Sequence, residues 1–230
     1  MRDLRGDLGN VWRAASRLTS KSGGGRTVMF VSARDGEGTS SVAASIALLA
    51  AHRAQKAVWL VDLDLRRNAA FKGFEHGFAK RVGSPGRAFD ASLRQEQIYS
   101  IVPRLATRGG DRLLTAHEIR DTQLFVTRFR NEYLNKGQRV QIKTQPGWWT
   151  ALCQIADWGI VDAPSLERSP AALAIASQMD GVFLVVEADS TSADDVVAAR
   201  REIEAHGGDV RGIIMNRVGS DARLADRFAS

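Results

Sequence analysis

The chain has 230 residues, 44% of them hydrophobic, and carries 32 basic and 26 acidic side chains, for a net charge of +6. This apolar content is enough to bury one full core, and a single cysteine, Cys153, excludes both an intrachain disulfide framework and a multi-cysteine metal site. Because no run of about 18 apolar residues is present and the first residues lack the apolar stretch of a secretory signal, we expect a cytoplasmic protein without a membrane-spanning helix.

The first 26 residues are predicted to form a helix followed by a glycine-rich linker. Apolar residues recur at helical spacing between Leu4 and Leu18, with arginines among them. Three uses of this helix stay open, namely packing on its own domain, docking to a partner and lying on a membrane surface. Residues 20–25 are rich in serine and glycine and are expected to be flexible, so that the helix moves relative to the rest of the chain.

A glycine-bearing loop joins the first strongly apolar segment to the next helix. Residues 28–32 are typical of a buried strand and residues 42–51 of a helix, with Gly36 and Gly38 in the connection. A strand that feeds such a loop and a helix N-terminus is the arrangement that binds phosphate groups through backbone N–H donors. The pattern places a lysine directly after its last glycine, and Thr39 stands at that position here.

Two carboxylates end the next predicted strand. Residues 57–65 are apolar apart from Asp62 and Asp64, and the two-residue period of a strand puts both on one face. A strand, a helix and a strand in close succession predict a parallel pair, and the carboxyl ends of such strands border the ligand crevice of the sheet. Two carboxylates in that crevice suit Mg²⁺, directly or through its water ligands.

The middle of the chain has a weaker pattern. We expect a short strand within 97–105, an amphipathic helix over 120–134 and an edge strand over 139–143. The tryptophan pair at 148–149 begins a further helix, and both rings are expected to pack in the core.

Alternating strands and helices return in the last third of the chain. The predicted elements are a strand over 158–164 that contains Asp162, a helix over 169–178, a strand over 181–187, a helix over 192–206 and a strand over 210–217. Together with the first two strands, these units predict an α/β fold with a mostly parallel open sheet and helices on both faces.

Four separated motifs resemble those of one protein superfamily. They are the glycine loop over 33–40, the aspartate pair followed by two arginines over 61–67, the strand end over 160–164 and the late strand over 213–217. In this order and at this spacing they resemble the bacterial tyrosine kinases of capsule and exopolysaccharide synthesis, a branch of the ParA/MinD superfamily of P-loop ATPases, with a degenerate Walker A motif. The resemblance implies a P-loop NTPase-like domain over 27–230, with a divergent region over 68–147.

The resemblance also implies a role for each motif residue. ATP or ADP would be bound, weakly if at all, by Gly36, Glu37, Gly38, Thr39, Ser40, Ser41, Asn216 and Arg217. Mg²⁺ would be held by Ser40, Asp64 and Asp162. The catalytic set would be Asp62, Asp64 and Arg34, because Arg34 occupies the position where ParA and MinD relatives carry a second lysine.

Two departures from the family pattern argue against ordinary kinase activity. Thr39 lacks the positive charge that lysine brings to the phosphates, and such charge stabilisation is a main contribution to phosphoryl transfer. The kinases carry a C-terminal tyrosine cluster as their own substrate, whereas residues 221–230 contain no tyrosine and the chain has only Tyr99 and Tyr133. We therefore expect impaired hydrolysis and no autophosphorylation of such a cluster.

Three functions follow from these observations. The first is a kinase-like regulatory or scaffolding component of exopolysaccharide synthesis and export, of capsule or holdfast type. Its partner would be the cytoplasmic part of a membrane polysaccharide co-polymerase or chain-length protein, which would hold it at the inner membrane. Assembly into a homodimer or larger oligomer is also possible.

The second function is that of an active ATPase or protein tyrosine kinase in which Arg34 replaces the lysine. The third is a ParA-like positioning ATPase that binds DNA nonspecifically, and because the basic residues are scattered, nucleic acid is the least expected partner.

Overall fold

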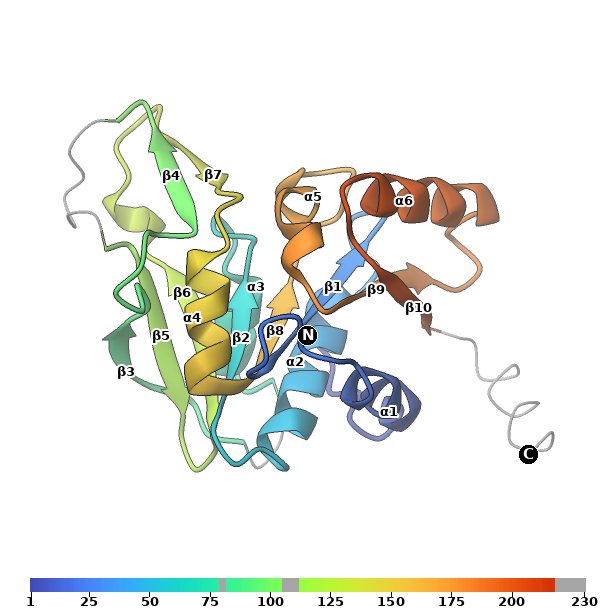
Figure 1. Cartoon of the computed structure of the whole chain (residues 1–230), viewed down its shortest axis with the longest axis horizontal. Helices are drawn as coiled ribbons and strands as arrows, with labels where there is room; N and C mark the ends of the chain where they lie inside the picture. The colour runs from blue at the N-terminus through green and yellow to red at the C-terminus, as the bar shows by residue number, and fades with distance from the viewer. Residues whose placement is uncertain (79–81, 105–111, 218–230) are drawn as a thin grey trace.

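The computed structural model describes residues 1–78, 82–104 and 112–217. Within these residues, eight strands form one sheet in the order β10-β9-β1-β8-β2-β6-β5-β3, and β4 and β7 form a separate antiparallel pair (Figure 1). The strands are β1 Arg26–Ser32, β2 Ala57–Asp62, β3 Pro85–Asp90, β4 Tyr99–Val102, β5 Leu114–Ile119, β6 Leu124–Phe129, β7 Arg139–Ile142, β8 Ala156–Asp162, β9 Gly181–Glu187 and β10 Val210–Asn216. The strands from β10 to β6 are parallel, whereas β5 and β3 are antiparallel, which confirms the expected mostly parallel α/β sheet.

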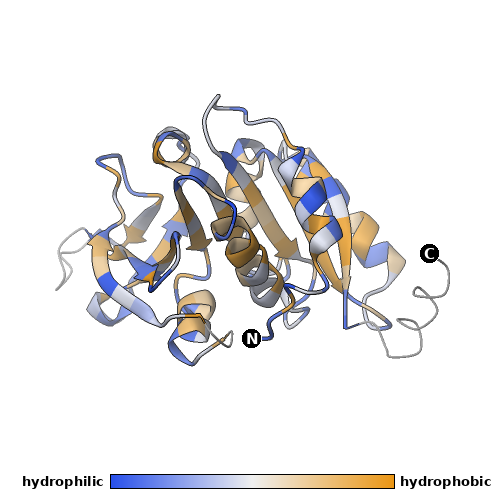
Figure 2. Cartoon of the chain, turned by 90° about the horizontal axis from the view of Figure 1, so that it is seen from below, coloured by the Kyte–Doolittle hydropathy of each residue, from blue (hydrophilic) through white to orange (hydrophobic). Residues whose placement is uncertain are grey.

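Helices cover both faces of the sheet. They are α1 Gly9–Ser16, α2 Thr39–Ala51, α3 Ala69–Glu75, α4 Gly147–Ile155, α5 Ala171–Ile175 and α6 Ala193–Ala205, with short 3₁₀ turns at Asn131–Tyr133 and Ala176–Gln178. Alternate residues of β1 point to opposite faces, so Val28 and Phe30 pack with α1, α2 and α3, whereas Met29 and Val31 pack with α4, α5 and α6. Figure 2 shows the resulting apolar strands and helix faces in the interior, with hydrophilic residues outside.

The N-terminal segment is fastened to the rest of the chain. Leu4, Leu8 and Leu18 are buried in the same core cluster as α2, and the Leu4 N–H donates to the Ser45 hydroxyl at 2.9 Å. In the glycine-rich stretch, the Gly25 N–H donates to the backbone carbonyl of residue 153 at 2.7 Å. These contacts join the first segment to the core and give no support to the expected movement of the helix, which stays a prediction. The division of the chain at residue 26 stays a prediction.

The middle of the chain contains an element that was predicted wrongly. The strands expected within 97–105 and over 139–143 are found as β4 and β7, and Trp148 is buried as expected. The helix expected over 120–134 is wrong, since this segment forms the end of a β5–β6 hairpin, strand β6 and a 3₁₀ turn. Strand β6 pairs in parallel with β2, so its apolar residues are buried by the sheet rather than by a helix face.

The other predicted elements are confirmed with small changes. The helix expected over 169–178 is the shorter α5 followed by a 3₁₀ turn, and α6 begins after Ser192, whose side chain forms a capping box with Asp195. Across the described part of the chain, no helix has the length and apolar character needed to cross a bilayer.

Candidate functional site

The glycine loop lies at the carboxyl edge of the parallel strands, between the end of β1 and the start of α2. Gly36 and Gly38 have φ angles of +89° and +92°, a backbone region that residues with a Cβ rarely adopt. The loop leads into the N-terminus of α2, whose first N–H groups have no partner within the helix. A cleft of about 430 Å³ opens at this loop. Its lining contains every residue predicted to bind the nucleotide, namely Gly36, Glu37, Gly38, Thr39, Ser40, Ser41, Asn216 and Arg217.

A buried carboxylate and an amide hold the loop in place. The carboxylate of Glu37 accepts the Arg34 N–H at 2.8 Å and also the hydroxyl of Thr191, which ties the loop to the end of β9. The Asn216 amide donates from Nδ2 to the Glu37 carbonyl at 2.8 Å. Glu37 and Asn216 therefore line the predicted nucleotide cleft and also fix the shape of the loop.

Substitution of the two loop glycines should separate backbone strain from crowding. A Cβ on Gly38 would lie 2.1 Å from the Asn216 amide nitrogen, whereas a Cβ on Gly36 would meet nothing within 4 Å. Both substitutions carry a positive-φ cost of about 1–2 kcal/mol. We expect Gly38→Ala to lower the free energy of unfolding by about 1 kcal/mol more than Gly36→Ala, because it also displaces Asn216. Urea unfolding of the two variants measures the difference, and equal losses would contradict the contact.

Thr39 leaves a polar atom unpaired at the start of α2. It is the first residue of that helix, its side chain lines the cleft, and the residue is only 8% exposed. Among the described residues, its Oγ1 has no hydrogen-bond partner. A buried hydroxyl without a partner costs free energy, and a phosphate oxygen at the helix N-terminus would supply the missing acceptor. The phosphate part of a nucleotide therefore fits this loop, although the loop itself brings no cation.

Two buried carboxyls lie at the ends of neighbouring strands, and one of them, Asp162, interacts with the Ser40 hydroxyl of the loop. Asp62 of β2 and Asp162 of β8 are register partners, and both are buried. Burial, followed by the nearby charge of Asp162, raises the pKa of Asp62 well above its usual range. Burial also raises the pKa of Asp162 to about 7, although the Ser40 hydroxyl works in the opposite direction. A divalent cation close to the pair would favour the ionised forms.

The predicted carboxylates have different positions. Asp64 lines the cleft, whereas the lining does not include Asp62 or Asp162. The Asp62 carboxylate accepts the N–H groups of Asp64 at 2.8 Å and Ala70 at 2.9 Å, so it shapes the turn after β2. The expectation that the first two aspartates share one strand face is therefore wrong, because β2 ends at Asp62.

The proposed Mg²⁺ ligands fit a metal that is held only partly by protein. Within the described residues, no group of three or more His, Cys, Asp or Glu side chains is arranged to hold a metal ion. Mg²⁺ usually keeps several water molecules and takes substrate phosphates as ligands. The Ser40 hydroxyl, which interacts with Asp162, and the Asp64 carboxylate suit such a site, and their role as ligands stays a prediction.

Two arginines that were not among the predicted site residues close one side of the cleft. Arg168 contacts Asp64 at 2.8 Å and Asp35 at 3.0 Å, and Arg67 contacts Asp35 at 3.0 Å. We call these four residues the arginine–aspartate cluster. Arg67 follows the aspartate pair in its motif, whereas Arg168 lies in an irregular segment after β8 and carries no sequence signal that would have identified it.

Arg34 does not occupy the place of the missing lysine. Its guanidinium contacts the Asp195 carboxylate at the start of α6 at 2.7 Å, and half of the side chain is exposed. The cleft lining does not include Arg34. The position of Arg34 therefore does not support its predicted role as a catalytic cation at the phosphates.

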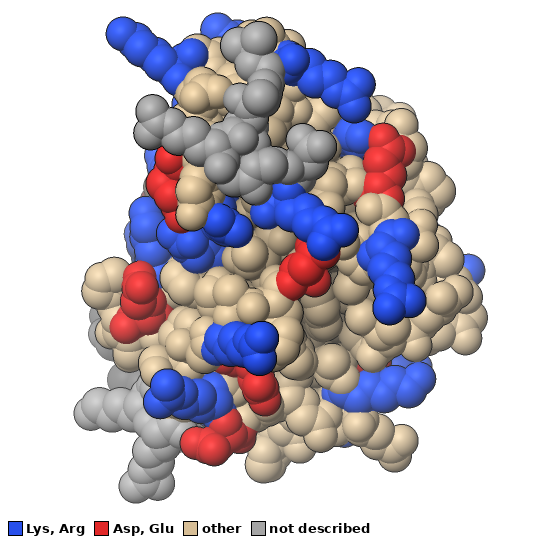
Figure 3. All heavy atoms as spheres, turned by 90° about the vertical axis from the view of Figure 1, so that its left-hand side faces the viewer, with Lys and Arg blue, Asp and Glu red and all other residues tan. Residues whose placement is uncertain are grey.

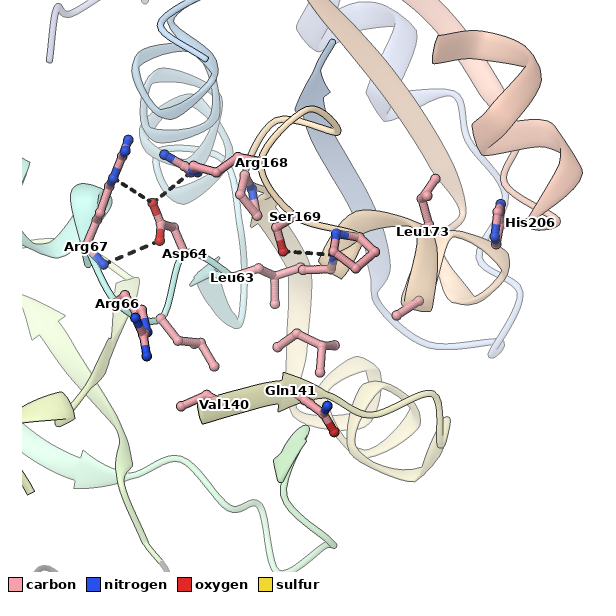
Figure 4. Close-up of a pocket in the computed structure, with 16 residues that line it drawn as sticks. Leu63, Asp64, Arg66, Arg67, Val140, Gln141, Arg168, Ser169, Leu173 and His206 are labelled. Atoms are coloured by element: carbon pink, nitrogen blue, oxygen red, sulfur yellow. Dashed lines mark hydrogen bonds and ion pairs between the residues drawn. The ribbon is translucent and has the colours of Figure 1, made fainter. Parts of the chain in front are cut away.

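A second cavity of about 700 Å³ lies on the other side of the arginine–aspartate cluster (Figure 4). Asp64, Arg67 and Arg168 line both cavities, so these side chains form a partition between them. The remaining walls are mostly apolar and come from β7, the turn after β2 and α5. Figure 4 shows Val140 and Leu173 on opposite sides of this cavity, with Asp64 bound to both arginines at its rim.

Basic residues are mixed with acidic ones on the molecular surface. Figure 3 shows the face on the β3 side of the sheet, where Lys and Arg side chains are interrupted by acidic and uncharged residues. Exposed pairs such as Arg128–Glu132 and Arg200–Glu204 neutralise part of the charge elsewhere. Among the described residues of the face in Figure 3, the basic side chains do not form the continuous patch that is typical of nucleic-acid binding.

Comparison of the structure with solved proteins identifies the fold. The kinase domain of VpsO superposes with a TM-score of 0.62 at 18% sequence identity, covering 94% of each chain. The tyrosine kinase domain of BceF gives a TM-score of 0.53 at 19% identity, covering 92% of this chain and 74% of the other. A chain of the MinC:MinD cell division complex of Aquifex aeolicus gives 0.53 at 16% identity, covering 89% and 73%.

Comparisons by sequence add nothing to this result, since no described protein family and no curated protein matches the chain. The structural matches extend over 89% or more of this chain, so they include the parallel strands and the glycine loop between β1 and α2. The chain therefore has the α/β fold shared by bacterial tyrosine kinase domains and MinD- and ParA-type P-loop ATPases.

Proposed function

We propose that the chain binds Mg–ATP and Mg–ADP in the cleft at the glycine loop and hydrolyses ATP slowly. The observation that carries this proposal is Thr39, a buried residue whose hydroxyl has no partner in a loop that is otherwise shaped for phosphate. The backbone donors at the start of α2 are retained, so binding is supported. The lysine charge is missing, so the transition state of phosphoryl transfer loses a major stabilising contact.

The biological role that we propose is a kinase-like regulatory or scaffolding component of exopolysaccharide synthesis and export. The proposed partner is the cytoplasmic part of a membrane co-polymerase or chain-length protein, which places the chain at the inner membrane. The likeness in fold to the VpsO and BceF kinase domains supports this role. Helix α1 and the turn after Asp64 are the proposed contact surfaces, because Arg13 and Arg17 of the first segment and Arg66 of the second are exposed.

The test combines calorimetry with a hydrolysis assay on the same preparation. We expect micromolar affinity for ATP and ADP in the presence of Mg²⁺, with turnover far below the roughly 1–100 s⁻¹ of active kinases. Adding the cytoplasmic segment of a candidate co-polymerase should change nucleotide affinity if the two proteins are partners. Absence of nucleotide binding would contradict the proposal, and ordinary turnover would instead favour an active ATPase or kinase.

A further inference from the structure

A chain with this cleft still needs positive charge near the phosphates, and the structure offers a source outside the glycine loop. Resting on the proposed nucleotide binding, we propose that Arg168 contacts the γ-phosphate of bound ATP in place of the missing lysine, and that it leaves Asp64 to do so. Arg168 would then distinguish ATP from ADP.

The backbone around Arg168 is joined directly to the glycine loop. The Leu166 N–H donates to the Ser32 carbonyl at 2.9 Å, and the Glu167 N–H donates to the Ala33 carbonyl at 3.1 Å. The Glu167 carboxylate in turn accepts the Asp35 N–H at 3.1 Å. These three contacts hold the backbone beside Arg168 in place relative to the loop, so a change of rotamer can move the guanidinium without moving the backbone.

The guanidinium already bridges the loop and the predicted metal ligand. Its two terminal nitrogens contact Asp35 at 3.0 Å and Asp64 at 2.8 Å, and the side chain is 27% exposed. An anion that enters the cleft therefore comes within reach of a cation that is partly shielded from water. Charge-assisted hydrogen bonds in such a setting are stronger than those at an open surface.

The other arginines of the cleft lining and Arg34 are less well placed, and Arg2 of that lining is exposed. The Arg67 side chain is 56% exposed, and its guanidinium lies 3.8 Å from the Asp64 carboxylate. Arg217 is bound to Glu187 at 2.7 Å, and Arg34 is bound to Asp195 outside the cleft. Among these described arginines, Arg168 is the one whose guanidinium hydrogen-bonds to two cleft carboxylates and whose neighbouring backbone is bonded to the loop.

Exchange of partners explains how Arg168 becomes available. When Mg²⁺ binds at Asp64, it replaces Arg168 as the positive partner of that carboxylate. The freed guanidinium nitrogen would then be available to the γ-phosphate as a new acceptor, while the other nitrogen could keep its contact with Asp35. ADP lacks the γ-phosphate, so Arg168 gains less from its binding. Because Arg168 also lines the apolar cavity of Figure 4, the exchange would alter the wall of that cavity.

Calorimetric titration of the full chain with Mg–ADP and with a non-hydrolysable Mg–ATP analogue tests the proposal. The wild type should bind the analogue more tightly than ADP. Arg168→Gln should weaken binding of the analogue by about 10- to 100-fold, as expected for loss of a charged hydrogen bond, while the affinity for ADP changes less than about threefold. The matched control is Arg200→Gln, an exposed arginine paired with Glu204 on α6, which should leave both affinities unchanged.

Two further variants keep the result interpretable. Arg168→Lys retains the charge with a shorter reach and should recover part of the preference, which separates loss of charge from damage to the fold. An Arg168→Gln protein that keeps the wild-type preference would overturn the proposal, as would loss of the preference in Arg34→Gln. A wild type that binds neither nucleotide would contradict the proposed function itself, a result distinct from binding without a role for Arg168.

Discussion

Replacing Thr39 by lysine is expected to raise ATP turnover by about 10²- to 10³-fold. Removal of one preorganised donor to a developing charge lowers the rate of an enzyme by the same factor. Thr39 is the first residue of α2 and lines the cleft of about 430 Å³, which leaves room for a longer side chain. The new ammonium group would face Asp35 and Asp64, which also line the cleft, so its burial has charged partners. Initial rates of phosphate release at saturating Mg–ATP measure the effect.

The matched control for this gain is Thr39→Met. Methionine has a length close to that of lysine and no charge, so it tests whether filling the cleft changes turnover by itself. We expect no increase in hydrolysis from Thr39→Met. Its nucleotide affinity is measured on the same samples. Equal turnover in the two variants, with nucleotide bound to both, would show that the missing charge does not limit hydrolysis.

The free energy of unfolding should fall as the pH rises from about 4 to about 7, and the buried carboxyls should cause much of this fall. The pKa of Asp162 is raised from 3.8 to about 7 in the folded protein, and that of Asp62 is raised as well. In this pH window the folded state holds protons that the unfolded state has released, so each step upward in pH favours unfolding. The contribution of Asp162 is on the order of 4 kcal/mol and is complete above its folded pKa.

Asp162→Asn isolates this contribution. The variant retains the shape of the side chain and removes the charge, so it should gain stability relative to the wild type between about pH 5 and pH 8. Urea midpoints at several pH values measure the gain. Addition of Mg²⁺ at the upper pH should stabilise the wild type more than NaCl of equal ionic strength does, because a divalent cation near the pair favours the ionised forms. Parallel pH profiles of wild type and variant would contradict the assignment.

Most of the sheet could be predicted because its strands have simple requirements. Strands β1, β2, β8 and β9 are buried on both faces, which demands continuous apolar runs that are visible in the sequence. The segment over 120–134 failed for a physical reason. Its apolar residues are compatible with one face of a helix, and only the neighbouring strand β2 selects the extended form by offering a free edge.

Site residues could be predicted only where they belong to a recognisable sequence motif. The glycine loop and Asn216 were recognisable from the sequence and do lie together, with Asn216 bonded to the loop. Arg168 could not be found in this way, because its importance depends on contacts with Asp35 and Asp64, which lie 133 and 104 positions away in the chain. Arg34 shows the opposite case, since its sequence position predicted a role that its contact with Asp195 does not support.

The sequence by itself therefore determined the alternation of strands and helices, the loop shaped for phosphate and the absence of a lysine at Thr39. These features depend on local backbone preferences and on residue identity, and both can be inferred from residues that are close together in the sequence. The tertiary structure alone decided which charges meet at the cleft. Which carboxylates an arginine contacts depends on which of them lie nearby in the folded chain. The segment after β8 packs against the glycine loop, so Arg168, rather than Arg34, contacts the carboxylates of the site.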